Sequence, residues 1–287
     1  MSERSPQICS MKGRNWPAFH RLDEEIFPDD MVSQEYFMKR VEQEGFFALK
    51  TSSGQIVGQL ILGRFGEDKG RLNRIGVAKS LQQRGLGTKL MNFAFKWFQE
   101  QQTITKVILY TQQDNIAAQR LYRRFDFKTT GTTRHYVVPL KSLNPLGRYK
   151  CQRIRSEEIE EAGEQFRQAL PAAEIRRSLE SQQLVLTLKD QSSRIVGICG
   201  FSPSFPGCFP FEIKYTESFD DFVYGLQRYA LPEFDYIRVT FTDNAELAQL
   251  CGNRDYRLHH KLFKMEAAVT NLESKHRKKG EESGQES

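Results

Sequence analysis

The sequence lacks a long apolar run, and this absence limits where the protein can reside. No stretch of about 18 consecutive apolar residues occurs, so we expect no transmembrane helix. The first residues, MSERSPQICSMKGR, contain no apolar core of the length found in secretory signals. Cysteines are few, odd in number and without C-x-x-C spacing: Cys9, Cys151, Cys199, Cys208 and Cys251. We therefore expect free thiols in a reducing cytoplasm, no membrane contact and no metal site.

The sequence also lacks a large block of charge of one sign. The net charge is +6 and the pI is about 9.0, but 42 basic residues are scattered among 36 acidic ones. The densest basic cluster, Lys275 to Lys279, is soon followed by Glu281 and Glu282. This pattern favours a solvated surface over a nucleic-acid site, while mild positive charge suits an anionic ligand. The polar residues 269–287 are expected to be disordered.

The apolar residues that are present suffice for a sizeable core. With 287 residues, 39% of them hydrophobic, the chain can form one large or two ordinary domains. Asn15 as N-cap and Pro17 in the first turn predict a helix that ends near Ile26. A second helix is expected from Ser33 to Gly45. The sequence predicts strands at 46–51, 55–63, 106–111, around 126–130 and 134–140, with a helix capped by Asp114-Asn115 before the last two.

The segment from Leu72 to Met91 combines a short apolar strand, a glycine-containing loop and an apolar helix. Its loop has the pattern Gln82-x-x-Gly85-x-Gly87. Glycines allow a ligand close to the backbone, and the first amides of a helix are unsatisfied donors at a positive dipole end. Position 90 is Leu, so the three-glycine dinucleotide pattern is absent, as is the Gly-Lys-Ser/Thr ending of a P-loop. The segment therefore predicts a phosphate-binding turn of another type, with Lys79, Arg84 and Lys89 adding positive charge.

A second sequence feature is an internal repeat that begins after the linker at Pro145 and Gly147. RIVGICG at 194–200 resembles QIVGQLI at 55–61, and TFTDNAELAQL at 240–250 resembles TQQDNIAAQRL at 111–121. Because these segments occur in the same order in both halves, we predict that one fold is duplicated. The second half has no glycine loop, since Thr216-Glu217-Ser218 stands there, and Glu217 would repel a phosphate.

The first half resembles the GCN5-related N-acetyltransferases (GNAT superfamily) over about residues 7–140. Its loop is similar to the family's acyl-CoA pyrophosphate loop, Gln/Arg-x-x-Gly-x-Gly/Ala. NIAAQRLYRRFDF at 115–127 resembles a second family segment, which Asn115, Ala118, Tyr122 and Phe127 match, while Asp126 replaces the usual glycine. The resemblance implies an α+β chain of two tandem GNAT-like folds, each a mixed, mostly antiparallel sheet flanked by helices. The expected domains are residues 1–145, catalytic, and 149–268, a degenerate copy.

The resemblance also implies which residues bind acetyl-CoA and assist the transfer. In this family an amine attacks the thioester carbonyl directly, so the site must bind the diphosphate, stabilise an oxyanion and protonate a thiolate. The backbone N–H near Val77 is the implied oxyanion donor. Tyr122 is the implied acid, although its position on an amphipathic helix also suits a core aromatic. The residues expected at the coenzyme are Ile75, Val77, Gln82, Gln83, Arg84, Gly85, Leu86, Gly87, Thr88 and Asn115.

No residue stands out as the general base. Related enzymes that act on N-terminal amines often carry Glu or His on the strand before the Asn segment, where this sequence has Tyr110. The preceding strand offers Arg71, Asn73 and Arg74 but no carboxylate. His135, in TTRHYVV, is a candidate base, and an exposed strand residue is an equally good interpretation. Tyr110 and His135 are therefore kept as candidate catalytic residues beside Tyr122.

The lack of an obvious general base bears on which amine the enzyme would acetylate. At pH 7.4, deprotonating an α-amine of pKa about 8 costs about 0.8 kcal/mol, against about 4 kcal/mol for a lysine. Ile26-Phe27-Pro28 and Tyr36 resemble the substrate loop of peptide N-terminal acetyltransferases, and Tyr136 resembles a residue of their substrate entrance. We expect a peptide or protein α-amine as acceptor and a monomer or homodimer that binds no nucleic acid. A small-molecule amine as acceptor, or a non-catalytic acyl-CoA-binding scaffold, remain alternatives.

Overall fold

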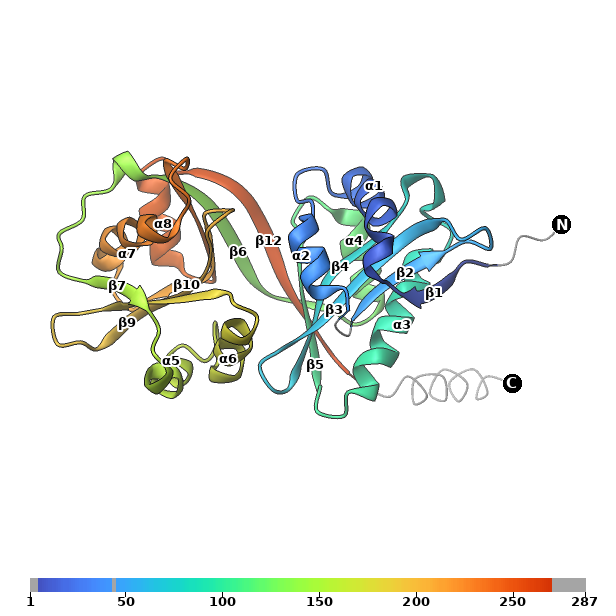
Figure 1. Ribbon diagram of the computed structural model, residues 1–287, viewed down its shortest axis with the longest axis horizontal. Helices are drawn as coiled ribbons and strands as arrows, with labels where there is room; N and C mark the ends of the chain where they lie inside the picture. The colour runs from blue at the N-terminus through green and yellow to red at the C-terminus, as the bar shows by residue number, and fades with distance from the viewer. Residues whose placement is uncertain (1–4, 43–44, 270–287) are drawn as a thin grey trace, which may run out of the picture. The chain divides into compact units, whose positions relative to one another are not determined.

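The computed structural model describes residues 5–42 and 45–269, which form two compact units (Figure 1). The first unit comprises the described residues up to Leu109, Ile116–Lys128 and the described residues from Met265. The second unit comprises Tyr110–Asn115 and Thr129–Lys264. Each unit therefore contains a segment from the other half of the sequence: Tyr110–Asn115 belongs to the second unit, and the described residues from Met265 belong to the first. The predicted domains, 1–145 and 149–268, instead divide the chain at one point, and that division stays a prediction. The predicted tail lies, except for residue 269, outside the described residues.

The first unit is an α+β fold with strand order β1-β2-β3-β4-β5. Strands β1 to β4 pair antiparallel, and β5 joins β4 in parallel. Its elements are β1 (Gln7–Ser10), α1 (Trp16–Ile26), α2 (Gln34–Arg40), β2 (Phe46–Lys50), β3 (Ile56–Phe65), β4 (Lys69–Val77), the 3₁₀ turn η2 (Lys79–Leu81), α3 (Leu86–Glu100), β5 (Lys106–Gln112) and α4 (Ile116–Arg124).

Alternating residues of β2 show that helices cover both faces of this sheet. Phe46 packs in a core with Phe19 of α1 and Phe37 of α2. Its neighbour Phe47 points to the opposite face, because successive side chains of a strand alternate. There Phe47 makes an edge contact with Phe93 of α3, with ring centroids 4.7 Å apart. The sheet is therefore held between α1 and α2 on one face and α3 on the other.

The second unit repeats this architecture, with strand order β12-β6-β11-β10-β9-β8-β7. One core contains residues of α7 and α8, and another contains residues of α5 and α6. Its elements are β6 (Lys128–Pro139), β7 (Lys150–Arg153), the 3₁₀ turn η4 (Ser156–Glu158), α5 (Ile159–Gln165), α6 (Ala172–Glu180), β8 (Leu184–Lys189), β9 (Ile195–Ser202), β10 (Gly207–Ile213), the 3₁₀ turn η5 (Thr216–Ser218), α7 (Phe219–Leu226), β11 (Tyr236–Thr242), α8 (Ala245–Asn253) and β12 (Arg257–Ala268). The predicted fold class is confirmed.

Three local predictions were wrong. Helix α2 ends at Arg40 rather than at Gly45. Gly45 itself lies outside the helix, with φ +99° and its carbonyl accepting the N–H of Leu62 at 2.8 Å. The strands predicted near 126–130 and 134–140 are one strand, β6, which pairs continuously with β11 over Thr133–Pro139. In the second half the sequence predicts one helix, at 156–170, where the structure has two, so α6 was not predicted. No described helix is long and apolar enough to span a bilayer.

In both units two parallel strands part soon after they pair. β4 and β5 are paired only over Lys69–Arg71 and Lys106–Ile108, so the rest of β4, up to Val77, leaves β5. β10 and β11 are paired only over Gly207–Cys208 and Arg238–Val239. Beyond these points the facing edges have no ladder hydrogen bonds between them, which frees backbone groups for other partners. The candidate site begins at the end of β4.

Candidate functional site

A tight turn connects β4 to α3. The side chain of Gln82 folds back, and its Nε2 donates to the carbonyl oxygen of Val77 at 3.1 Å. Gln83 and Gly85 both have left-handed backbones, with φ of 60° and 78°. Such a conformation is strained for Gln83 and natural for Gly85, so the turn combines one strained and one permissive residue. It brings the chain into α3 at Leu86 directly after the end of β4.

The N-terminus of α3 is open and lacks negative charge. Gly85 is its N-cap, so no side chain caps the first turn, and that turn contains no acidic residue. A Cβ added at Gly85 would meet no atom within 4 Å. A Cβ at Gly87 would lie 3.2 Å from Cδ2 of Leu121, so a larger residue there would make the Leu121 side chain on α4 shift slightly. The first amides of α3 can therefore bind an anion, as a helix N-terminus does.

Positive charge lies beside these amides. Arg124, in the last turn of α4, donates from Nη2 to Oγ1 of Thr88 at 3.3 Å. Arg84 is exposed in the turn itself. Ile75 and Val77 lie in the part of β4 that has left β5, as predicted residues of the coenzyme site should. The structure thus brings most of the predicted coenzyme residues together at one turn, with charge and shape suited to a diphosphate.

Tyr122 and Asn115 come from the helix α4 region. Tyr122 is buried, and burial raises the pKa of its phenol above the ordinary value of 10.0. The hydroxyl therefore keeps its proton at neutral pH, which an acid must do. Its ring lies 5.9 Å from that of Phe127, so the core-aromatic interpretation also agrees with its surroundings. Asn115 is exposed just before α4, and its N–H donates to the carbonyl of Gln112 at 3.2 Å.

His135 and Tyr110, the candidate bases, belong to the second unit. Burial, followed by the charges of His259, Arg238, His260 and Arg257, lowers the pKa of His135 to about 4. The imidazole is therefore neutral at pH 7 and able to accept a proton. Tyr110 makes an edge contact with Phe209, with ring centroids 5.4 Å apart. Both residues stay predicted candidates for the proton acceptor.

Tyr136, predicted at the substrate entrance, lies in the core of the second unit. It is 7% exposed, and its ring stacks on Phe241 with centroids 5.9 Å apart. β6 pairs with β11, so alternate residues of β6 face the same core as alternate residues of β11. Its assignment to the substrate remains a prediction, and its packing is that of a structural aromatic.

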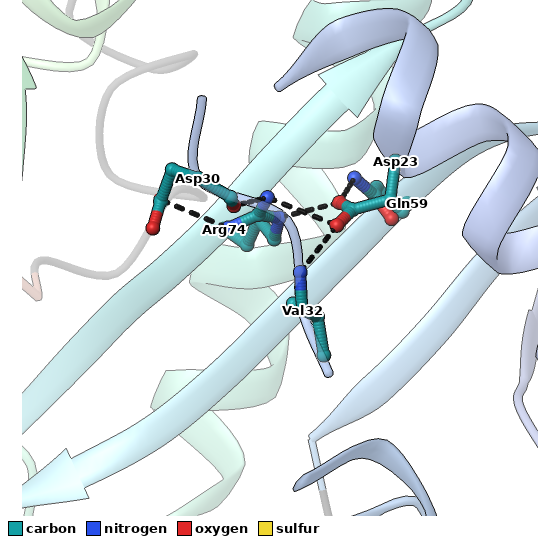
Figure 2. Close-up of polar contacts among 5 residues, drawn as sticks. All are labelled: Asp23, Asp30, Val32, Gln59 and Arg74. Carbon is teal, nitrogen blue, oxygen red and sulfur yellow. Dashed lines mark hydrogen bonds and ion pairs between the residues drawn. The ribbon is translucent and has the colours of Figure 1, made fainter. Parts of the chain in front are cut away.

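A buried ion pair orders the chain between α1 and α2, where Phe27 was predicted to contact substrate (Figure 2). Asp23 of α1 is fully buried and accepts from Nε of Arg74 on β4 at 2.6 Å. The same carboxylate accepts from Nε2 of Gln59 at 2.7 Å and from the N–H of Val32 at 2.7 Å. Nη2 of Arg74 donates as well, at 3.1 Å, so four hydrogen bonds from three residues satisfy the buried charge, as a buried carboxylate requires.

Arg74 also holds the loop that follows α1 (Figure 2). Its guanidinium donates to the carbonyl and the carboxylate of Asp30 and lies 4.0 Å from the ring centre of Phe27. Tyr36 lies beyond this loop in the first turn of α2, with its N–H bound to Oγ of Ser33 at 3.2 Å. The sequence analysis missed this network because Asp23 and Arg74 are 51 positions apart, and no spacing connects them. Phe27 is thus fixed against β4.

Comparisons with known proteins agree with this geometry. Residues 10–127 match the sequence model of the acetyltransferase (GNAT) family. No curated protein matches the sequence. Similar solved structures include a GCN5-related N-acetyltransferase from Sphaerobacter thermophilus (TM-score 0.69, 12% identity, 93% of this chain and 96% of that chain). A putative acetyltransferase from Pyrococcus horikoshii (0.71, 11%, 95% and 92%) and a tandem GNAT protein from the clavulanic acid biosynthesis pathway (0.64, 11%, 93% and 99%) are also similar. At these identities the solved structures establish the fold.

Proposed function

We propose that the protein is an acetyl-CoA-dependent N-acetyltransferase, starting from the match of residues 10–127 to the acetyltransferase (GNAT) family model. The GNAT fold supports acyl transfer from acetyl-CoA to an amine in general. The observation that carries the proposal for this chain is the uncapped, acid-free N-terminus of α3 directly behind Gly85. We further propose that transfer occurs by direct attack of the amine in a ternary complex.

The residues at this turn fit coenzyme A. The amides of α3 have no capping side chain, the space at Gly85 is open, and Arg124 supplies positive charge at Thr88. Amides from Gln82 to Thr88 would bind the diphosphate, with Ile75 and Val77 on the adjacent edge of β4. When bound, acetyl-CoA supplies the activated thioester.

Tyr122 is proposed as the acid. Its phenol holds a proton on Oη at neutral pH because burial raises its pKa, and it would give that proton to the leaving thiolate. Acid catalysis of this kind is typically worth about 10²–10⁴-fold in rate. The N–H near Val77 is the proposed oxyanion donor, since β4 has left β5 there. The proton acceptor stays open between His135 and Tyr110.

For the acceptor we propose the α-amine of a peptide or protein. Neither candidate proton acceptor, His135 or Tyr110, is a carboxylate. An amine of pKa about 8, which costs about 0.8 kcal/mol to deprotonate at pH 7.4, suits such a site better than a lysine. The loop with Phe27, fixed by Arg74, would form one wall for that acceptor. The alternatives are a small-molecule amine and an acyl-CoA-binding scaffold without turnover.

The test is incubation with acetyl-CoA and a panel of free-amine peptides, lysine-only peptides and small amines, read by mass spectrometry. We expect acetyl groups on peptide α-amines. Acetylation confined to lysines or small amines would contradict the acceptor. Coenzyme A binding by calorimetry without turnover of any amine would favour the scaffold. Y122F should bind coenzyme A like the parent and turn over about 10²–10⁴-fold more slowly; equal turnover would exclude Tyr122 as the acid.

A further inference from the structure

Arg238, on β11 of the second unit, carries a charge that no described carboxylate neutralises. Its guanidinium lies 3.8 Å from the ring centre of Phe205 and 5.6 Å from that of Tyr236. Its recorded side-chain hydrogen bond is long, from Nη2 to the hydroxyl of Tyr236 at 3.5 Å. Its Nε is buried and has no hydrogen-bond partner in the described part of the protein. Such a donor is costly unless a ligand satisfies it.

A second unsatisfied nitrogen lies on the same face of the sheet. His135 on β6 stands opposite Thr240, and Arg238 stands opposite Val137, so Arg238 and His135 are diagonal neighbours across the two strands. Tyr136 and Val239, the residues next to each in sequence, face the hydrophobic core. Arg238 and His135 therefore both point away from that core. Nε2 of His135 is also buried and without a partner among the described residues.

Among the described residues, the charged and titratable groups that shift the pKa of His135 are all basic. They are His259 and His260 on β12, Arg257 at the start of β12, and Arg238. The ring of His135 lies 5.2 Å from that of His259 and 5.8 Å from that of His260. The described residues contain no group of three or more His, Cys, Asp or Glu placed to hold a metal ion. Basic groups gathered without an acid provide a favourable place for an anion.

We propose that Arg238 and His135 form a binding site for the carboxylate or phosphate of a small-molecule ligand. The N–H at Nε of Arg238 and an N–H at Nε2 of His135 would donate to two oxygens of one anionic group. Carboxylates and phosphates present oxygens that match a guanidinium fork and an adjacent donor. The aromatic rings of Phe205 and Tyr236 hold the guanidinium plane and restrict its motion. The site shares His135 with the proposed acetyl transfer, in which that residue is one of two candidate proton acceptors, but anion binding is measured without turnover, so the two proposals can fail separately.

The experiment is an NMR titration of the histidine ring signals of the full-length protein with two probes, inorganic phosphate and glutarate. The ring signal of His135 is assigned by its loss in H135N. We expect saturable shifts of this signal with at least one probe, and the stronger probe identifies the preferred anion. R238Q should weaken that binding at least tenfold. R153Q is the matched control, because Arg153 also approaches an aromatic ring in this unit, Tyr229 at 6.0 Å, but is exposed.

Two results would overturn the proposal. One is the absence of a saturable His135 shift with either probe; the other is equal binding by R238Q and the parent protein. If R238Q does not fold, as judged by its circular dichroism and thermal midpoint, R238K decides. It keeps the charge but lacks the Nε–H donor, so a loss of at least fivefold supports the site and unchanged affinity contradicts it.

Discussion

The same position in the two units, the start of the helix that follows the fourth strand, is built in opposite ways. In the first unit, α3 begins after Gly85 with uncapped amides and no acid. In the second unit, α7 begins with Phe219 and carries Asp220 and Asp221 in its first turn, both buried. The fold therefore offers an anion-binding helix end twice, and the sequence keeps it open only once.

Two acidic residues in the first turn of α7 bind the linker that follows β6. Asp221 accepts the N–H groups of Gly147, Arg148 and Tyr149 at 2.8, 2.9 and 3.1 Å. Asp220 accepts the N–H of Asn144 at 3.0 Å. The carboxylates of Asp220 and Asp221 thus bind the linker at the start of α7, and a phosphate that approached this helix end would meet their negative charge. The sequence analysis attributed this loss to Glu217, in η5; the structure adds Asp220 and Asp221.

The largest expected effect comes from removing the carboxylate that binds the linker. D221A should lower the free energy of unfolding by about 3 kcal/mol, because three N–H groups lose an ionised acceptor. The measurement is urea denaturation. D190A is the control, since Asp190 accepts the N–H groups of Ser192 and Arg194 in an exposed turn and should cost less than about 1 kcal/mol. If D221A and D190A lose the same free energy of unfolding, the linker contacts of Asp221 stabilise the fold no more than an exposed turn does.

The second effect concerns Gly85. G85V should weaken coenzyme A binding about 100-fold, because a β-branched residue at φ +78° displaces the amides of α3. G54V is the matched control: Gly54 has φ +84° and equally open space, but it lies in the β2–β3 turn. Calorimetry with coenzyme A measures both. If G85V binds coenzyme A as tightly as G54V does, the N-terminus of α3 does not bind the coenzyme, and the proposed difference between α3 and α7 in anion binding is wrong.

A smaller effect should follow from making α3 resemble α7. Thr88 is the third residue of α3, as Asp221 is of α7. T88D should weaken coenzyme A binding about tenfold at low salt and less at high salt, because the new charge repels phosphates and salt screens it. T88N, which is neutral and of similar size, should retain the affinity. If T88D binds coenzyme A as tightly as T88N does, negative charge in the first helical turn is not what prevents anion binding at α7.

The smallest expected effect is a pH dependence of stability caused by Glu212 in the second unit, where the first unit has Gly76 at the matching strand position. Glu212 precedes Ile213 at the strand position where Gly76 precedes Val77, and burial raises the Glu212 pKa to about 7. The folded carboxyl keeps its proton to about pH 7 while the unfolded one loses it near pH 4.5, so stability falls as pH rises between these values. E212Q should gain about 1 kcal/mol at pH 8 and little at pH 4, measured by urea denaturation. A gain that is the same at both pH values would refute this titration.

The sequence predicted those parts of the fold and site that depend on neighbouring residues. Gln82, Gly85 and Gly87 lie within one turn, so their spacing together with the flanking strand and helix predicted the tight turn between β4 and α3, and phosphate binding there stays a prediction. The Asp23–Arg74 pair could not be predicted in this way, because it forms only when α1 packs on β4. The orientation of Tyr136 was likewise set by β11, about 100 residues later in the chain. Tertiary pairing, rather than local preference, decided both.

The segment Met265–Ala268, at the end of β12, belongs to the first unit, where the N–H of Val269 binds the carbonyl of Thr105 at 2.8 Å. Met265 and Ala267 are buried there. On the ribosome, these residues are synthesised well after the rest of that unit. The N-terminal unit must therefore wait, incomplete, until Ala268 has emerged, and a chain interrupted at the linker would yield no complete copy of either fold.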